Sequence, residues 1–242
     1  HQLADSFNDM FDKLDRSFEA ECRFTSDASH ELRTPVSVIA AQCELSLEKP
    51  RSPEEYEDAL RTIQRQNRKM SRLIGDMLEF TRLEVSPDRY WKENFNFTGL
   101  VESVCTDMAP IREKEITLQH EAEDMIEFCG NQELLTRLLT NLISNAYRYG
   151  KERGHIWVHL QKANGEILLT VRDDGIGIAK EEQEKIFRRF YQTDSSRANA
   201  GMGLGLSMAQ EIARFHRGEI TVESTPDVGS TFQVRFPVSE SV

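Results

Sequence analysis

The pattern of apolar positions changes near residue 86 and divides the chain into two parts. In the first 85 residues, apolar side chains return every three or four positions, which is the period of an α-helix. The run Lys49-Pro50-Arg51-Ser52-Pro53 interrupts this pattern, and Ser52 followed by Pro53 is typical of a new helix start. We therefore predict a helical hairpin. Its apolar lines are Leu3, Phe7, Met10, Leu14 and Tyr56, Leu60, Ile63, Asn67, Met70, Ile74, Met77, Thr81.

The spacing within these lines is of the coiled-coil kind. Two helices with such long apolar lines bury too little surface by themselves. The pattern therefore favours dimerisation of the hairpin into a four-helix bundle.

Beyond a short linker, Val85-Ser86-Pro87-Asp88, helical and alternating patterns follow one another. Alternating residues on either side of Ala163-Asn164-Gly165 predict a β-hairpin, and a second pair of strands flanks a turn at 225–229. We expect an α+β chain in which the hairpin precedes an antiparallel-rich sheet with helices on one face, an α/β sandwich. The expected strands are 155–162, 166–173, 218–224 and 230–237, and the expected helices are 98–114, 132–149 and 204–217.

Composition narrows the function classes. The chain has 242 residues and a formal net charge of −11, which argues against a general nucleic-acid binder. No apolar run approaches the roughly 20 residues that span a bilayer, and no signal peptide is visible. The chain lacks an initiator Met, so we expect a fragment of a longer protein. Four widely spaced cysteines without metal-ligand spacing favour buried thiols in a reducing cytosol: Cys22, Cys43, Cys105 and Cys129.

His30 is the first candidate for chemistry. At about 100° per residue it lies opposite an apolar stripe that includes Ala28, Leu32 and Val36, so its imidazole is expected in solvent. Glu31 follows it directly, and Thr34 lies one turn further along. Taken alone, such a residue is more often a solvated surface histidine. A nucleophile presented to an approaching group is the second interpretation.

Three elements of the second part suggest a nucleotide site. Asn141 and Asn145 share a helix face, and an amide oxygen suits Mg²⁺ that is also held by phosphates, with Arg148 one turn on. Asp173-Asp174-Gly175-Ile176-Gly177 closes a strand, where a carboxylate can accept the adenine amino hydrogen. Gly201-Met202-Gly203-Leu204-Gly205-Leu206 runs into a helix whose N-terminus can bind phosphate. Taken singly, each of these motifs also has an ordinary structural interpretation. The three are an Asn pair that caps or bridges a local turn, an Asp-Gly turn and a glycine-rich loop.

Together these residues resemble the cytoplasmic core of a bacterial two-component sensor histidine kinase. The resemblance covers the chain after about residue 20, and Leu3 to Met10 resembles the closing helix of a HAMP relay module. It implies a HAMP-like signalling helix over 1–20, a dimerisation and phosphotransfer hairpin over 21–86 and a catalytic ATP-binding domain of the gyrase and chaperone type over 87–242. The matching motifs are the H box at Ser29 to Pro35, the N box at Asn141 to Tyr149, a first glycine box at Asp173 to Gly177, the F box at Phe187 to Phe190 and a second glycine box at Gly201 to Leu206.

The resemblance also implies roles. His30 would take the γ-phosphoryl group of ATP, with Glu31 as its base, and pass that group to an Asp of a response regulator. Thr34 would help to dephosphorylate the regulator, and Asn145 would hold Mg²⁺. The polar stretch from Tyr191 to Ala200 would be a mobile lid, and the linker near residues 85–88 would let the domain swing. The residues expected to bind ATP are Asn141, Asn145, Arg148, Tyr149, Asp173, Gly175, Gly177, Gly201, Gly203, Leu204, Gly205 and Leu206.

The implied partners are a second copy of the chain and a receiver domain, with neither nucleic acid nor a direct membrane contact. The intact protein would lie in the inner membrane with this part facing the cytoplasm. Two alternatives stay open: an ATPase clamp of the same superfamily without histidine phosphorylation, and a non-catalytic docking module. The remaining histidines within the chain are expected to be ordinary surface or sheet residues: His120, His155, His159 and His216.

Overall fold

A computed structural model of the chain describes residues 2–111, 113–192 and 203–238. It separates into two compact units, residues 1–78 and residues 79–242. Each unit is described by itself. Among the described residues, no helix combines the length and the apolarity that crossing a bilayer requires.

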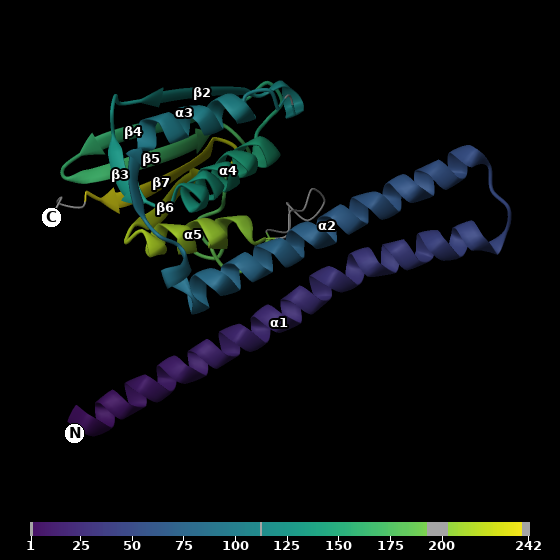
Figure 1. The fold of residues 1–242 in the computed structure, drawn as a ribbon, viewed down its shortest axis with the longest axis horizontal. Coiled ribbons are helices and arrows are strands. Elements are labelled where there is room, and N and C mark those ends of the chain that lie inside the picture. Colours follow the sequence, from purple (N-terminus) through teal and green to yellow (C-terminus); the bar gives the residue numbers. More distant parts are fainter. Residues whose placement is uncertain (1, 112, 193–202, 239–242) are drawn as a thin grey trace. The chain divides into compact units, whose positions relative to one another are not determined.

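The first unit is the predicted helical hairpin. Helix α1 spans Gln2–Glu48 and helix α2 spans Pro53–Val85, so the division between the units falls within α2 (Figure 1). At the start of α2, the main-chain N–H of Glu55 donates to Ser52 Oγ at 3.3 Å and the N–H of Ser52 donates to Glu55 Oε2 at 2.8 Å. This is a reciprocal capping box with a proline at the first helical position, and it explains why α2 begins there.

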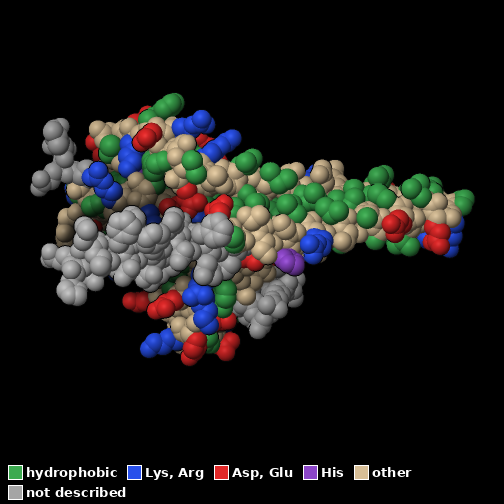
Figure 2. Space-filling view, turned by 90° about the horizontal axis from the view of Figure 1, so that it is seen from below, with side chains coloured by type: hydrophobic (Ala, Val, Ile, Leu, Met, Phe, Trp, Pro, Cys, Tyr) green, Lys and Arg blue, Asp and Glu red, His purple; other side chains and the backbone are tan. Residues whose placement is uncertain are grey.

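Only part of the apolar surface of the hairpin is buried. Phe24 and Ala28 on α1 are buried, and so are Ala59 and Leu73 on α2, which lie two heptads apart. The line expected from Tyr56 to Thr81 is largely exposed, with Leu60 at 65%. Figure 2 shows hydrophobic side chains gathered along the hairpin. Among the residues whose side chains the structure describes, the exposed large apolar residues of this unit are Val36, Leu45, Leu47, Tyr56, Leu60, Ile74 and Leu78.

The second unit is built on a mixed sheet of five strands. Its order is β2-β4-β5-β7-β6, in which β2 pairs parallel with β4 and the other pairs are antiparallel. A smaller sheet pairs β1 with β3. The helices α3, α4 and α5 lie over the larger sheet (Figure 1). The elements are β1 Glu93–Asn96, α3 Phe97–Met108, β2 Thr117–Ala122, β3 Glu127–Gly130, α4 Gln132–Tyr149, β4 His155–Ala163, β5 Glu166–Asp173, α5 Gly205–Phe215, β6 Glu219–Thr225 and β7 Gly229–Pro237, with short 3₁₀ turns at Pro87–Arg89 and Glu113–Glu115.

This architecture confirms the predicted α+β fold class. The expected hairpin of 155–173 is β4 and β5, the expected strands near 218–237 are β6 and β7, and α4 matches its predicted bounds. Alternate residues of β4 and β5 are buried, so one sheet face packs under the helices. The sequence pattern missed β1, β2 and β3, and α3 ends at Met108 rather than near residue 114.

The last turns of α2 contribute to the core of the second unit. Phe80 and Leu83 are buried within the same apolar cluster as the sheet and the helices. Glu79 accepts a hydrogen bond from Tyr90 Oη at 2.7 Å and pairs with Arg137 Nη1 at 3.1 Å. Residues 79–85 are thus packed and hydrogen-bonded within this unit.

His216 is not the surface or sheet residue that we expected, because it is buried at the end of α5. Its Nε2 accepts the main-chain N–H of Asn131 at 3.0 Å, and its Nδ1 lies 2.8 Å from the carbonyl oxygen of Ile212. A neutral ring protonated on Nδ1 satisfies both contacts. Burial lowers the pKa of His216 to about 4.

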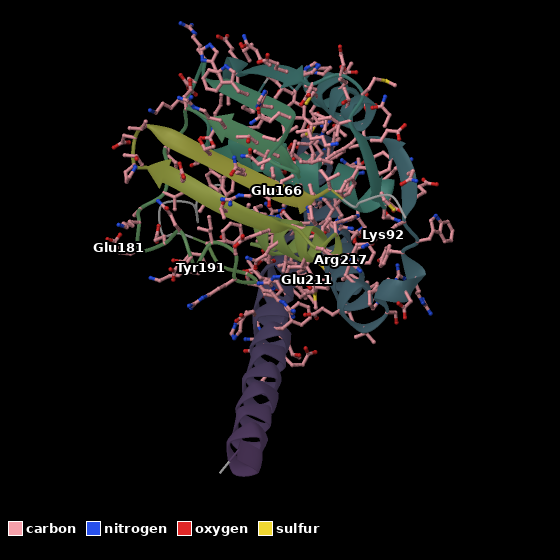
Figure 3. The ribbon with its side chains drawn as sticks, turned by 90° about the vertical axis from the view of Figure 1, so that its left-hand side faces the viewer. Lys92, Glu166, Glu181, Tyr191, Glu211 and Arg217 are labelled. Carbon is pink, nitrogen blue, oxygen red and sulfur yellow. The ribbon has the colours of Figure 1, made fainter. Side chains whose placement is uncertain are left out.

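The end of α5 carries a second cap. Lys92 Nζ donates to the carbonyl oxygen of Phe215 at 2.8 Å and lies 4.5 Å from the centre of its ring. Figure 3 shows Lys92 and Arg217 together at this end of the helix. The hydrogen bond to Phe215 satisfies one of the carbonyl groups that an α-helix leaves free at its C-terminus.

The expectation of buried thiols holds for only one cysteine. Cys105 is buried in α3, and burial raises its pKa to about 12. Cys22, Cys43 and Cys129 are exposed. Their wide spacing in sequence carried no information about the face on which each one lies.

Candidate functional site

His30 lies exposed on α1, as predicted. Two residues before it, Ala28 is buried at 4% exposure, so the two side chains lie on different faces of the helix. Ser29 Oγ donates to the carbonyl oxygen of Thr25 at 2.8 Å, which keeps that hydroxyl within its own helix. The imidazole of His30 is thus available to a group arriving from solvent.

Glu31 is half-buried and Thr34 is exposed on the same helix. Within the described part of the chain, no hydrogen bond joins Glu31 to His30. Consecutive helix positions diverge by about 100°, so a contact between these side chains requires their rotamers to turn toward one another. Their proposed roles as base and as water-positioning residue stay predictions.

Helix α4 carries the N box. Its N-cap is Asn131, whose Oδ1 accepts the N–H of Leu134 at 3.0 Å. One face is buried in the core, and the opposite face keeps Asn141, Asn145 and Arg148 half-buried. Asn141 Nδ2 donates to the carbonyl oxygen of Gly205 at 3.2 Å, so this side chain joins α4 to the start of α5. The buried residues of α4 are Leu134, Leu135, Leu138, Leu139, Leu142, Ile143, Ala146 and Tyr147.

Asp173 ends β5 with its side chain buried at 6% exposure. Its Oδ1 accepts the N–H of Gly175 at 2.9 Å. Burial raises the pKa of Asp173 to about 6, although hydrogen bonds from the main chain of Gly175 and Ser230 act in the opposite direction. A buried acceptor of this kind suits a ligand that brings its own hydrogen-bond donor.

The glycines after Asp173 are required by close packing. A Cβ at Gly175 would lie 2.4 Å from the carbonyl oxygen of Tyr149. Gly177 has a φ of +67°, and a Cβ there would lie 2.0 Å from the carbonyl oxygen of Thr225. This places the first glycine box between the end of α4 and the turn that joins β6 to β7.

The second glycine box is described only in part. Gly201 lies outside the described residues, as does the stretch 193–200 of the expected lid. Gly203 has a φ of +67°, and its carbonyl oxygen accepts the N–H of Phe190 in the F box at 2.9 Å. Leu204 is buried and stands at the N-cap of α5 without a side-chain cap, followed by Gly205 and Leu206. The amides at this helix start suit an anionic ligand.

Sequence reasoning missed the groups that clamp this site from the β6–β7 turn. The N–H of Asp227 donates to the carbonyl oxygen of Ile176 at 2.8 Å, and Lys151 Nζ donates to the carbonyl oxygen of Asp227. Ser224 Oγ accepts the N–H of Ile178 and donates to the carbonyl oxygen of Gly229, both at 2.8 Å. Turn residues marked this loop as a strand connection, but no local pattern said what it would touch.

The end of α4 is fixed in a similar way. Lys114 Nζ donates to the carbonyl oxygens of Arg148 at 2.6 Å and of Gly150 at 2.9 Å. The carbonyl oxygen of Tyr149 accepts the N–H of Ile176 at 3.1 Å. The structure therefore brings most of the predicted nucleotide residues of the second unit together around α4, the first glycine box and the start of α5.

Mg²⁺ fits this site only as a metal shared with phosphates. The half-buried amide of Asn145 can supply one oxygen ligand of the hard type that Mg²⁺ prefers. Over residues 2–111, 113–192 and 203–238, no group of three or more His, Cys, Asp or Glu side chains could hold a metal ion. A dedicated all-protein cage is thus not part of the described site.

Comparison with known proteins identifies both parts. Residues 20–85 match the His Kinase A phospho-acceptor domain, and residues 130–240 match the histidine kinase-, DNA gyrase B- and HSP90-like ATPase. The chain is 36% identical over 229 residues, 92% of its length, to the sensor histidine kinase RppB of Synechocystis. It is 33% identical over 239 residues, 98% of its length, to the signal transduction histidine-protein kinase ArlS of Staphylococcus epidermidis.

A solved structure shares the fold. The histidine kinase ThkA in complex with the response regulator protein TrrA superposes with a TM-score of 0.70 at 24% identity, over 94% of this chain and 66% of that one. The chain spans about half the length of its curated relatives, 50% of RppB and 52% of ArlS. The order of the two matched domains and these relatives together show that the chain belongs to the two-component sensor histidine kinases, of which it carries the catalytic core.

Proposed function

We propose that the chain is an ATP-dependent histidine kinase that phosphorylates its own His30 and passes the phosphoryl group to an Asp of a response regulator. The observation that carries this proposal is the buried carboxylate of Asp173 at the end of β5, enclosed by glycines that leave no room for side chains. A carboxylate in that place accepts a hydrogen bond from the amino group of adenine. It disfavours a base that carries a carbonyl group at the same position.

The remaining residues of the site hold the phosphates. Arg148 and the amides at the start of α5 face a polyanion with positive charge and N–H dipoles. Asn145, with Asn141 beside it, would supply an amide oxygen to a Mg²⁺ ion held together with the phosphates. When bound, the metal neutralises the charge of the phosphates. Tyr149 contributes its main chain to the wall beside Gly175.

His30 is the acceptor. One of its ring nitrogens forms a bond to the γ-phosphorus as the bond from that phosphorus to the bridging oxygen breaks, and ADP leaves. Glu31 takes the proton from the other ring nitrogen. Transfer to the regulator then forms an acyl phosphate on its Asp and returns His30 to the neutral state. Thr34, exposed one turn further along, positions water when the regulator is dephosphorylated.

The hairpin is the dimerisation unit. Its exposed apolar residues, Leu60 and Ile74 among them, exceed what two helices can cover for one another. A second copy of the chain provides the missing cover and completes a four-helix bundle. The half of the curated relatives that this chain does not span leaves room for a sensor region and a membrane anchor in the intact protein, with the kinase core in the cytoplasm.

The test is incubation with γ-labelled ATP and Mg²⁺. We expect an acid-labile, alkali-stable label on the wild-type chain and none on the His30→Gln variant, which still binds ATP. The label should move to a receiver domain chosen from a panel. ATP hydrolysis without any label dependent on His30 would instead support the ATPase clamp, and absence of ATP binding would support a docking module.

A further inference from the structure

The strand that carries Asp173 ends beside a histidine that has no role in the site described above. The ladder between β4 and β5 has Ile156 opposite Asp173 as its last pair. One residue further on, the N–H of Asp174 lies 3.4 Å from the carbonyl oxygen of His155, which is a long hydrogen bond. The main chain alone therefore holds this point of the first glycine box weakly.

Hydrogen bonds to the side chain of Asp174 reinforce this weak main-chain contact. Asp174 Oδ1 accepts the N–H of His155 at 2.9 Å, and Asp174 Oδ2 lies 3.1 Å from His155 Nδ1. Both carboxylate oxygens thus contact one residue of the neighbouring strand. Gly154 leaves the room for this, because a Cβ there would lie 2.5 Å from Asp174 Oδ1.

The imidazole of His155 is itself held in place. It stacks on Trp157, with ring centres 5.4 Å apart and planes inclined by 16°. The guanidinium carbon of Arg172 lies 5.3 Å from the centre of the Trp157 ring, and Trp157 pairs with Arg172 across β4 and β5. The stack fixes the direction in which Nδ1 points.

Charge supports the same arrangement. Although burial acts to raise it, the pKa of Asp174 lies below its ordinary value because the main chain and the ring of His155 donate hydrogen bonds to it. Asp174 therefore stays ionised beside Asp173. An ionised acceptor makes the stronger hydrogen bond with its donor.

We propose that the His155–Asp174 pair is a positioning device that fixes the end of β5, so that the Asp173 carboxylate faces the adenine amino group and selects adenine over bases that lack it. This inference rests on the proposed function of the site. His155 acts through Asp174 and touches no nucleotide, so it is a positioning residue. Its effect is selective for the base and leaves the phosphate contacts unchanged.

The test compares ATP with ITP, which carries a carbonyl group in place of the adenine amino group. Dissociation constants for both nucleotides are measured by calorimetry on the full 242-residue chain. His155→Phe keeps a ring to stack on Trp157 and removes the ring donor to Asp174 Oδ2, while the main-chain N–H of residue 155 still donates to Oδ1. We expect it to reduce the preference for ATP over ITP by about three- to tenfold, with the affinity for ITP unchanged.

Three further variants make the result specific. His155→Asn, which keeps an amide donor near the Nδ1 position, should restore the wild-type preference, and Asp174→Ala should reproduce the loss from the other side of the pair. His159→Phe is the matched control, because His159 lies four residues further along the same strand and pairs with Thr170 instead. In autophosphorylation, His155→Phe should raise the KM for ATP with kcat unchanged.

The outcomes separate this inference from the proposed function. Wild-type protein that binds both nucleotides equally would remove the adenine role of Asp173, and this inference with it. Wild-type preference that survives in both His155→Phe and Asp174→Ala would overturn the positioning role alone. Equal losses for ATP and ITP, with a lowered unfolding midpoint, would show that the pair only stabilises the fold.

Discussion

The helical hairpin and the sheet unit bury their apolar side chains to very different extents. In the sheet unit, three helices cover one sheet face, and the last turns of α2 add Phe80 and Leu83 to the same core. Side chains such as Leu138, Val158 and Phe236 are almost completely buried. In the hairpin, few apolar side chains are buried, and Leu47 and Leu60 are 85% and 65% exposed. The difference indicates that the sheet unit is closed within one chain, whereas the hairpin presents surface that a further helix pair can cover.

The largest expected difference between the units lies in the cost of removing a leucine. Leu138→Ala removes a side chain with 0% exposure, and we expect a loss of about 2–5 kcal/mol in the free energy of unfolding. Leu60→Ala should change the stability of the isolated chain by less than about 0.5 kcal/mol. Urea unfolding measures both.

The same pair of variants tests the dimer. If a second copy covers the hairpin, Leu60→Ala should weaken dimerisation in analytical ultracentrifugation, and Leu138→Ala should not. Equal dimer dissociation constants for wild-type protein and Leu60→Ala would remove this exposed line from the interface.

Lowering the pH should change the free energy of unfolding of the sheet unit through two buried groups, whose effects have opposite signs. The unfolded chain protonates His216 below its ordinary pKa of 6.5, whereas the folded chain does so only near 4, so stability falls by about 1.4 kcal/mol per pH unit in this window, about 3 kcal/mol in all. Asp173 does the reverse. Its folded pKa of about 6 lies above 3.8, so the folded chain takes up that proton first and regains stability as the pH falls below about 6.

Asp173→Asn separates these effects. Between pH 6 and pH 4, the variant should lose stability more steeply than wild type, by about 1.4 kcal/mol per pH unit, because the offset from Asp173 is gone. Other carboxylates cancel in the difference. Urea unfolding at pH 7, 6, 5 and 4.5 measures it, and parallel curves for the two proteins would contradict the raised pKa of Asp173.

Nucleotide binding should depend on the sheet unit alone. Asp173→Asn presents an amide that lacks the charge of the natural acceptor, and we expect ATP affinity to fall by about 10- to 100-fold. His30→Gln, on the hairpin, should leave the dissociation constant for ATP unchanged. A similar loss in both variants would contradict the division of roles between the units.

The smallest effect concerns the start of α2. Ser52→Ala removes one half of the capping box with Glu55, and the expected loss is about 1 kcal/mol of hairpin stability. Ser46→Ala is a matched control, because Ser46 Oγ donates back to the carbonyl oxygen of Gln42 in the last turn of α1 and caps no helix start. Circular dichroism during thermal unfolding measures both variants, and ATP affinity should not change in either.

Local patterns predicted most of the elements that turned out to be long or regular. The bounds of α4, the hairpin of β4 and β5, and the break between α1 and α2 follow from helical period, alternation and capping residues. The short strands β1 and β3 and the largely exposed β2 have no such pattern, because four residues, or a strand with little burial, do not repeat a period often enough to be recognised.

The residues of the candidate site divide in the same way, into those that a local sequence pattern indicates and those that it does not. Asp173, Asn145 and the glycines could be proposed for the site from the sequence, because their residue types are tied to a local chemistry and appear in a fixed order. Lys114, Lys151, Ser224 and His155 were not, because each acts on a segment far away in the sequence. The buried state of His216 likewise depends on the N–H of Asn131, 85 positions earlier.

The sequence alone determined where α1 ends and where α2 begins and ends, that His30 is exposed on its helix, and which residues form the predicted nucleotide motifs. These properties depend on neighbours within one or two turns or within one strand pair. The expected buried stripe of α1 held at Ala28 but not at Val36, which is 49% exposed. Only the tertiary structure decided which groups clamp the first glycine box, because long-range hydrogen bonds need the folded sheet to bring their partners together. It also decided that Asp173 and His216 have shifted pKa values, since burial is a property of the whole core and not of any segment.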